Sequence, residues 1–239
     1  MNFRLRKNFR NLKMVQENLK KVCNTLDFTY LSIVRPDYNH TNNVAKIQML
    51  DADEKPSLTG KNFIDVDGLL TDQESITLFS TNADCNLVLL YDSVKKVIAN
   101  VHAGWRGTFD KIVQNAIVKM KKEYESNPKD IICCFCPSIR KCHFEVDEDV
   151  AKKCEEIFGY FGNLNEIIVK GELKENKQKY YIDTVLINKI LLKNEGVLEK
   201  NIVDSNICSV CSKDKIHSRR AEGEDFELGC ALIAINNKN

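Results

Sequence analysis

One cysteine and one histidine stand where their side chains could do chemistry together. His102 ends the branched run KVIANVH and is followed by AGWRGT, a glycine-containing turn that leads to a predicted helix at Thr108. Cys85, in TNADC, comes directly before a second run, NLVLLY. The turn YDSVKK between the two runs is typical of a hairpin. Antiparallel pairing would bring Cys85 and His102 together at the end of the sheet away from that turn.

A thiol beside an imidazole supports two kinds of chemistry. The histidine can activate a thiolate nucleophile, or the two side chains can bind a transition metal. Asp84, next to the thiol, is a candidate acid/base group or simply an exposed turn residue. Arg106 and the helix end that follows it form a seat for phosphate or a carboxylate. The alternative is that His102 only ends a strand and Trp105 belongs to the core.

Four segments resemble the YfiH family, also called the polyphenol-oxidase or laccase-domain family. The run from TNADC to HAGWRGT is similar to the family's T-x-A-D-C and H-A-G-W-R-G-T elements. CPSIRKCHFEV resembles G-P-S-I-x-x-C-C-Y-E-V, SRRAEG resembles S-Y-R-A-E-G, and DYNHTNNV resembles Q-V-H-x-x-x-V. The resemblance covers residues 11 to 235 approximately. It implies that His40, otherwise a lone loop histidine, binds one metal ion together with Cys85 and His102.

The implied ligand set suits zinc or copper, because two imidazoles and one thiolate are borderline-soft donors. Three protein ligands leave a fourth position for water or substrate, and zinc in such a site brings the pKa of bound water towards roughly 7. The family's name refers to an oxidoreductase, a laccase. A single metal centre cannot supply the multi-copper cluster of a laccase, so we do not favour this function.

The resemblance implies a purine nucleoside phosphorylase that acts on adenosine, inosine or methylthioadenosine, with adenosine deamination as a second activity on the same metal. Its partners would be the nucleoside and phosphate. Arg106 and Arg220, which matches the arginine of S-Y-R, are the expected substrate-binding residues. Tyr38, Arg219 and Glu227 depart from the family pattern, which has Gln, Tyr and a basic residue at these positions.

Two other functions stay open at this point. Bacterial members of the family are also associated with cytoplasmic editing of peptidoglycan precursors, an amidase reaction that would use Cys85 and His102 or the same metal. The third reading is a non-enzymatic remnant that binds a metal or a partner. The length predicts a single YfiH-like domain, 1–239. The start MNFRLRKNFRNLK is expected to be a shortened form of the family's N-terminus.

The elements that position these residues are predicted from hydrophobic periodicity. Apolar residues at three- and four-residue steps over 12–26 predict an amphipathic helix, and further helices are predicted from Thr108, over 147–159, and over 183–194 with Asp183 as cap. Strand-like segments cover 31–35, 44–50, 76–80, 86–91, 96–102, 130–135 and 229–235. Residues 160–181 are expected to be a surface excursion. This order favours an α/β layered sandwich with a mixed, largely antiparallel sheet. The resemblance to the YfiH family implies a YfiH-like fold, which is similar to the catalytic domain of cytotoxic necrotizing factors.

Composition excludes several classes of protein. Lys plus Arg (35) nearly balances Asp plus Glu (34), and the net charge of +1 offers no global field for nucleic acid or an anionic membrane. We expect a cytosolic protein; nothing in the sequence bears on its oligomeric state.

Ten cysteines without a secretory signal favour free thiols. Cys208 and Cys211 form a CxxC, but a zinc ribbon needs a second pair, and Cys133, Cys134 and Cys136 lie in a strand-like run. Buried reduced thiols are therefore expected.

Overall fold

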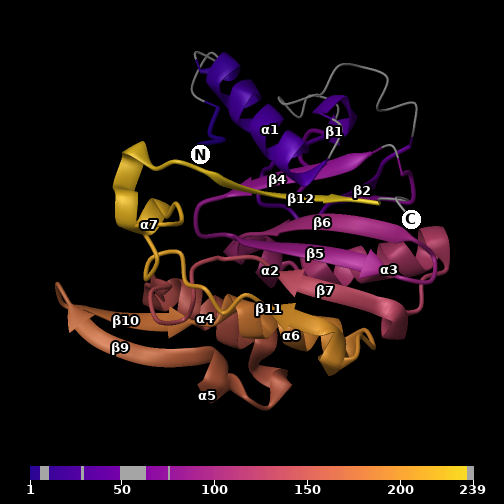
Figure 1. Cartoon of the computed structure of the whole chain (residues 1–239). Coiled ribbons are helices and arrows are strands. Elements are labelled where there is room, and N and C mark those ends of the chain that lie inside the picture. Colours follow the sequence, from indigo (N-terminus) through magenta and orange to yellow (C-terminus); the bar gives the residue numbers. More distant parts are fainter. Residues whose placement is uncertain (6–10, 28–29, 49–62, 75, 236–239) are drawn as a thin grey trace.

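The computed structural model describes residues 1–5, 11–27, 30–48, 63–74 and 76–235. The described residues form one six-stranded sheet and two three-stranded sheets. Figure 1 shows the layers: the first helix, a small sheet, the large sheet, and then a set of helices with a strand hairpin beside them. The helices are α1 (Leu12–Leu26), α2 (Trp105–Phe109), α3 (Ile112–Tyr124), α4 (Glu148–Phe158), α5 (Leu164–Ile167), α6 (Thr184–Asn194) and α7 (Arg219–Glu222). Among these helices, none combines the length and the apolar character that crossing a bilayer requires.

The six-stranded sheet carries the site. Its order is β11 (Ile202–Asp204), β7 (Ile131–Phe135), β5 (Asn86–Asp92), β6 (Val97–Ala103), β3 (Gly68–Thr71) and β2 (Val44–Lys46). The two outermost pairs are parallel and the inner pairs are antiparallel. The sheet that packs against the six-stranded one, called the three-stranded sheet below, has the order β1 (Ile33–Val34), β4 (Thr77–Asn82) and β12 (Gly229–Ala234). The expected mixed, largely antiparallel sheet is thus present.

Both faces of the central strand β6 are buried, which explains its nearly continuous apolar sequence. Val101 and Ala103 belong to the core beneath α2, α3 and α6, whereas Ile98 packs in the core shared with the three-stranded sheet. Because side chains alternate along a strand, His102 lies on the same face as Ile98. Asn100, also on that face, donates to the carbonyls of Leu78 and Ala231. His102 therefore ends a rigid strand between two packed sheets.

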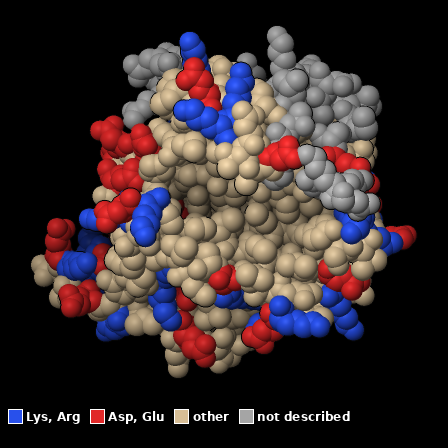
Figure 2. All heavy atoms as spheres, in the orientation of Figure 1, with Lys and Arg blue, Asp and Glu red and all other residues tan. Residues whose placement is uncertain are grey.

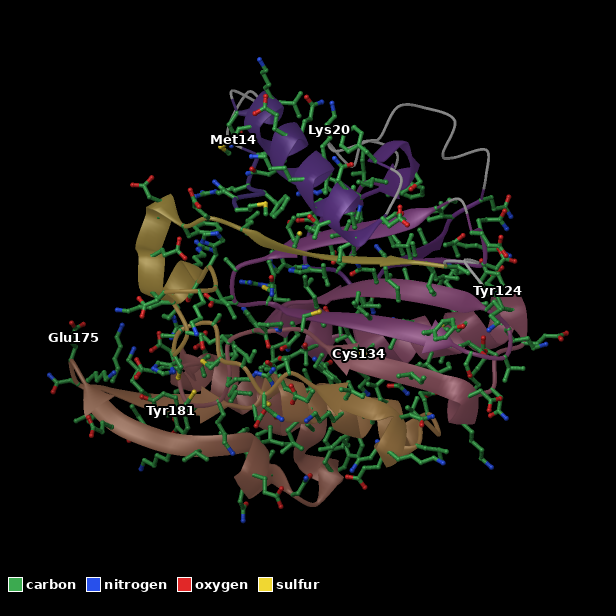
Figure 3. All side chains as sticks on the ribbon, in the orientation of Figure 1. Met14, Lys20, Tyr124, Cys134, Glu175 and Tyr181 are labelled. Carbon is green, nitrogen blue, oxygen red and sulfur yellow. The ribbon has the colours of Figure 1, made fainter. Side chains whose placement is uncertain are left out.

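Several predicted elements need correction. The helix expected to start at Thr108 is two helices: α2 begins at Trp105, and α3 follows Lys111, whose φ of 61° breaks the helical path. Thr108 is no cap, because it lies inside α2 and its hydroxyl donates to the carbonyl of Ala103, the last residue of β6. The segment 160–181 lies largely at the surface, as expected, but it has regular structure that was not predicted. It includes the antiparallel hairpin β9 (Ile168–Lys174) and β10 (Lys177–Ile182), and β10 also pairs with β8 (Glu145–Val146). Figure 3 shows Glu175 at the tip of this hairpin.

Other predicted elements agree with the structure or differ in length. The first helix spans the predicted residues, and Asp183 accepts a hydrogen bond from the backbone of Leu186 as the predicted cap of α6. The strands expected over 31–35 and 44–50 are shorter, and residues 49–50 lie outside the described part. β3 was not predicted. It is a short, wholly buried GLLT segment without alternation, so no periodicity marks it.

Candidate functional site

The hairpin of β5 and β6 brings the predicted pair together. Leu87 pairs with His102 and Asn86 with Ala103, so Cys85 lies just past the end of the ladder beside His102. His40 reaches the same point from the loop after β1, with its ring 5.2 Å from the His102 ring in an edge-on arrangement. The ligand atoms of His40, Cys85 and His102 all lie within 4.8 Å of one another.

Asp67, which the sequence analysis did not single out, holds two of these residues in place. Its buried carboxylate is 2.8 Å from Nδ1 of His102. The backbone N–H groups of Asn39, His40 and Thr41 donate to the same carboxylate, and so does the Thr41 hydroxyl. One side chain thereby fixes the orientation of one histidine ring and the path of the loop that carries the other. His40 itself has a φ of 56°, which this clamp maintains.

Two glycines of the AGWRG turn permit the close approach of the His40 loop. A Cβ at Gly104 would lie 2.8 Å from Cδ2 of His40 and 3.2 Å from Sγ of Cys85. A Cβ at Gly107 would lie 2.9 Å from the backbone oxygen of Thr41. The separations of 2.8 and 2.9 Å are shorter than real Cβ contacts, so a side chain at either glycine would push the His40 loop away.

The electrostatics of the pair favour a thiolate beside an imidazolium when no metal is bound. Burial acts to raise the pKa of Cys85, but the charge of His102 and hydrogen bonds from His102 and His40 lower it to about 6. Burial acts to lower the pKa of His102, but the Cys85 thiolate and Asp67 raise it to about 9. The same thiolate is the form that binds a metal ion.

The arrangement fits a metal ion. Two imidazoles and a thiolate converge, and the hydrogen bond that Nδ1 of His102 donates to Asp67 leaves the other ring nitrogen for coordination. A carboxylate behind a ligating histidine is the usual outer partner of protein metal sites. His102 is buried and Cys85 half-buried, whereas His40 is exposed. The centre is therefore closed on the protein side and accessible on the side of His40.

A cavity of about 410 Å³ opens on this centre, within the usual size range of small-molecule sites. Trp105 and Phe144 give it aromatic surface, and three arginine side chains give it positive charge. Its lining residues are His40, Ala83, Asp84, Cys85, Asn86, Ala103, Trp105, Arg106, Ile139, Phe144, Thr184, Arg219 and Arg220. The cavity thus combines a metal-ligand set, an apolar face and cationic groups.

The other predicted site residues also line the cavity, with different surroundings. The carboxylate of Asp84 accepts hydrogen bonds from the hydroxyls of Ser209 and Ser218 and from the backbone of Arg220. These contacts favour a role in joining C-terminal segments to the site over acid/base chemistry. The Arg220 guanidinium donates to the carbonyls of His143 and Glu145.

Arg106 lies against the indole of Trp105, with its guanidinium carbon 4.3 Å from the ring centroid. Trp105 is half-buried and meets Phe109 edge-on, so it both packs on the core and faces the cavity. Trp105, Phe144 and Arg219 are lining residues that the sequence analysis did not assign to the site. For Arg219, the departure from the family's Tyr at this position was the available signal.

A test of the thiolate uses metal-free protein. Because the pKa of Cys85 is about 6, its alkylation by iodoacetamide should level off by pH 7, whereas an ordinary thiol continues to gain reactivity up to about pH 9. Peptide mapping by mass spectrometry follows Cys85 among the other cysteines. In a His102→Ala variant, the plateau should move towards higher pH. A Cys85 profile that rises through pH 8 in wild-type protein would contradict this assignment.

Comparison with known proteins decides the family. A family model described as multi-copper polyphenol oxidoreductase laccase matches residues 7–236. The chain belongs to this family. The resemblance to YfiH proteins is confirmed by a crystal structure of YfiH from Bacillus licheniformis, with a TM-score of 0.87 and 26% identity, covering 98% of this chain and 85% of that one. YlmD from Geobacillus stearothermophilus has a TM-score of 0.83 at 22% identity over 98% and 84% of the two chains, and supports the fold alone.

Relatives in the family carry names of nucleoside enzymes. One named purine nucleoside phosphorylase, from Clostridium acetobutylicum, is 33% identical over 208 residues, which are 87% of this chain and 76% of that protein. Adenosine deaminase RL5, from an unknown prokaryotic organism, is 33% identical over 196 residues, 80% of this chain and 70% of that protein. Human purine nucleoside phosphorylase LACC1 is 28% identical over 226 residues, 93% of this chain and 48% of the human protein. The chain therefore spans about half the length of that relative.

Proposed function

We propose that the protein is a metal-dependent purine nucleoside phosphorylase for adenosine, inosine or methylthioadenosine, with adenosine deamination as a second activity. The observation that carries the proposal is the cavity in which His40 and Cys85 face the same space as Trp105 and the arginine side chains. The names of the relatives support the same class of substrate.

His40, Cys85 and His102 would hold the metal ion, zinc or copper, and Asp67 would orient His102 and the His40 loop. A metal held there supplies a Lewis acid that stabilises developing negative charge. The protein's own groups do the rest. Trp105 and Phe144 offer apolar surface to a purine, and the arginines attract phosphate. In phosphorolysis, a phosphate oxygen bonds to C1′ of the ribose, the bond from C1′ to the base breaks, and the base leaves with the electron pair and takes up a proton.

To test the proposal, metal-loaded protein is incubated with adenosine, with and without phosphate, and separately with a UDP-muramoyl-serine precursor, and the products are identified. Adenine formed only when phosphate is present supports the proposal, and inosine formed without phosphate supports the second activity. Release of serine would instead indicate the peptidoglycan-editing amidase. If none of these products forms with protein whose metal content has been verified, the enzymatic proposal fails and a binding function stands.

Phosphate binding gives a sharper prediction. Arg106→Ala should raise the KM for phosphate by about 10- to 100-fold, the cost of removing a hydrogen-bonding cation from a dianion. Arg106→Lys should recover part of this loss, because the charge returns without the planar fork. Lys122→Ala, which removes an exposed cation on α3 outside the cavity, is the matched control. Because deamination needs no phosphate, its rate should change much less in Arg106→Ala. An unchanged KM for phosphate would remove Arg106 from this role.

A further inference from the structure

A second group of metal-ligating side chains lies outside the proposed reaction centre. Two tight turns, distant in sequence, each contribute two members. Cys142 and His143 come from the turn after Arg140, whose carbonyl accepts from the backbone of His143. Cys208 and Cys211 come from the CxxC turn, which is closed by a hydrogen bond from the backbone of Ser212 to the carbonyl of Cys208. The partner of the CxxC is thus the adjacent pair Cys142 and His143. A search of the sequence for a second CxxC would not find it.

The distances within this group match the edges of a metal tetrahedron. The sulfur of Cys142 lies 3.6 Å from that of Cys208 and 3.9 Å from that of Cys211. Nδ1 of His143 lies 3.2, 3.6 and 3.5 Å from the sulfurs of Cys142, Cys208 and Cys211, respectively. A tetrahedral zinc ion with Zn–S of about 2.3 Å and Zn–N of about 2.0–2.1 Å requires S···S edges of about 3.8 Å and S···N edges of about 3.6 Å. Five of the six separations between donors are therefore close to those of a tetrahedral zinc site, and the sixth, between the sulfurs of Cys208 and Cys211, is at most 4.8 Å.

The chemistry of the four donors also fits zinc. Three sulfurs and one imidazole form a Cys₃His set, a common composition of structural zinc sites, with no position left open for a substrate. The sulfurs are too far apart for a disulfide, which requires about 2.05 Å. Backbone N–H groups of Cys211 and Arg140 also donate to the sulfur of Cys208. Cys142 and Cys211 are exposed, so the expectation of buried thiols is wrong for these two.

We infer that Cys142, His143, Cys208 and Cys211 bind a structural zinc ion that joins the loop after β7 to the segment before α7. This ion is independent of the metal in the proposed reaction centre. It would brace one wall of the cavity, because the carbonyl of His143 accepts from Arg220 and Ser209, inside the CxxC, donates to Asp84. The neighbouring Phe144 lines the cavity directly.

Metal content per chain tests the inference. Full-length protein is loaded with zinc, desalted and analysed by plasma mass spectrometry. Cys211→Ser should lose one zinc equivalent relative to wild type, and Cys85→Ala/Cys211→Ser should lose one relative to Cys85→Ala. Cys134→Ser, on β7 (labelled in Figure 3) and not one of the four donors, should keep the wild-type content. Equal zinc in Cys211→Ser and wild type would overturn the inference, whatever the outcome for Cys85.

A second measurement needs no variant and so remains valid if Cys211→Ser does not fold. Wild-type protein is treated with iodoacetamide before and after chelation by EDTA, and each cysteine is quantified by peptide mapping. Cys142 and Cys211 are exposed and should react only after chelation, whereas the labelling of Cys134 should not change. Labelling of Cys142 and Cys211 at the same rate with and without zinc would contradict the site. So would a disulfide between cluster cysteines in protein purified with zinc and without oxidant.

Discussion

Replacing Cys85 with alanine is expected to remove the metal from the proposed reaction centre and to lower kcat/KM for phosphorolysis by more than about 100-fold. Loss of an outer hydrogen-bonding partner of a metal ligand typically costs about 10- to 100-fold, and loss of a ligand should cost more. His40 and His102 would remain, and two imidazoles alone hold zinc less tightly. Metal analysis and steady-state kinetics on the same preparation test both parts of the prediction.

The control for Cys85→Ala is Cys134→Ala, which removes another half-buried thiol, on strand β7, without touching the site. Full activity with unchanged metal content in Cys85→Ala would remove the thiol from the centre. Loss of activity with unchanged metal content would point to a nucleophile instead of a ligand, and iodoacetamide labelling of Cys85 in metal-loaded protein would then separate the two roles.

Replacing Asp67 with alanine is expected to have the largest effect on stability. It leaves Nδ1 of His102 and the backbone N–H groups of the His40 loop without their buried acceptor. We expect a loss of about 3–5 kcal/mol in the free energy of unfolding. For a chain of this size, that loss lowers the melting temperature by roughly 6–20 °C. Calorimetry of the metal-free protein measures this change without a contribution from metal binding.

Asp67→Asn separates orientation from folding. The amide keeps one acceptor oxygen, so folding should be damaged less, while metal affinity should fall by about 10- to 100-fold because His102 is held less firmly. Hydrogen bonds from His102 and Thr41 outweigh burial and lower the pKa of Asp67. Its stabilisation is therefore present above the ordinary Asp value of about 3.9 and is lost as the pH falls below it. The acid limb of the stability profile should weaken in Asp67→Asn. Asp65→Asn, in the same loop but exposed, should change neither property.

The part of the site that local sequence predicts is the hairpin pair. Strand-like runs and a short turn between Cys85 and His102 fix their proximity, because antiparallel register leaves little freedom. His40 is different. Its position depends on a loop held in a left-handed conformation by a carboxylate 27 residues later, so only family resemblance indicated it.

Residues whose role arises from tertiary packing could not be predicted. Asp67 directly precedes a short buried strand that has no periodicity, and in the sequence it is one acidic residue among many. The Cys₃His cluster joins two turns 66 residues apart, as in the contact of Cys142 with Cys208, and only the CxxC turn has a metal-ligand spacing of its own. The adjacent Cys142 and His143 do not mark themselves as its partner in the sequence. Figure 2 shows basic and acidic side chains intermingled on the face drawn, in keeping with the balanced composition.

The order of the site residues along the chain has a consequence for biosynthesis. His40, Asp67, Cys85 and His102 all precede residue 103, whereas the wall formed by Ile139, Phe144 and the arginines of α7 comes much later. On the ribosome, every donor of the reaction centre therefore emerges before the wall that encloses it has been made. The residues that enclose it, from Ile139 to the arginines of α7, are added only afterwards.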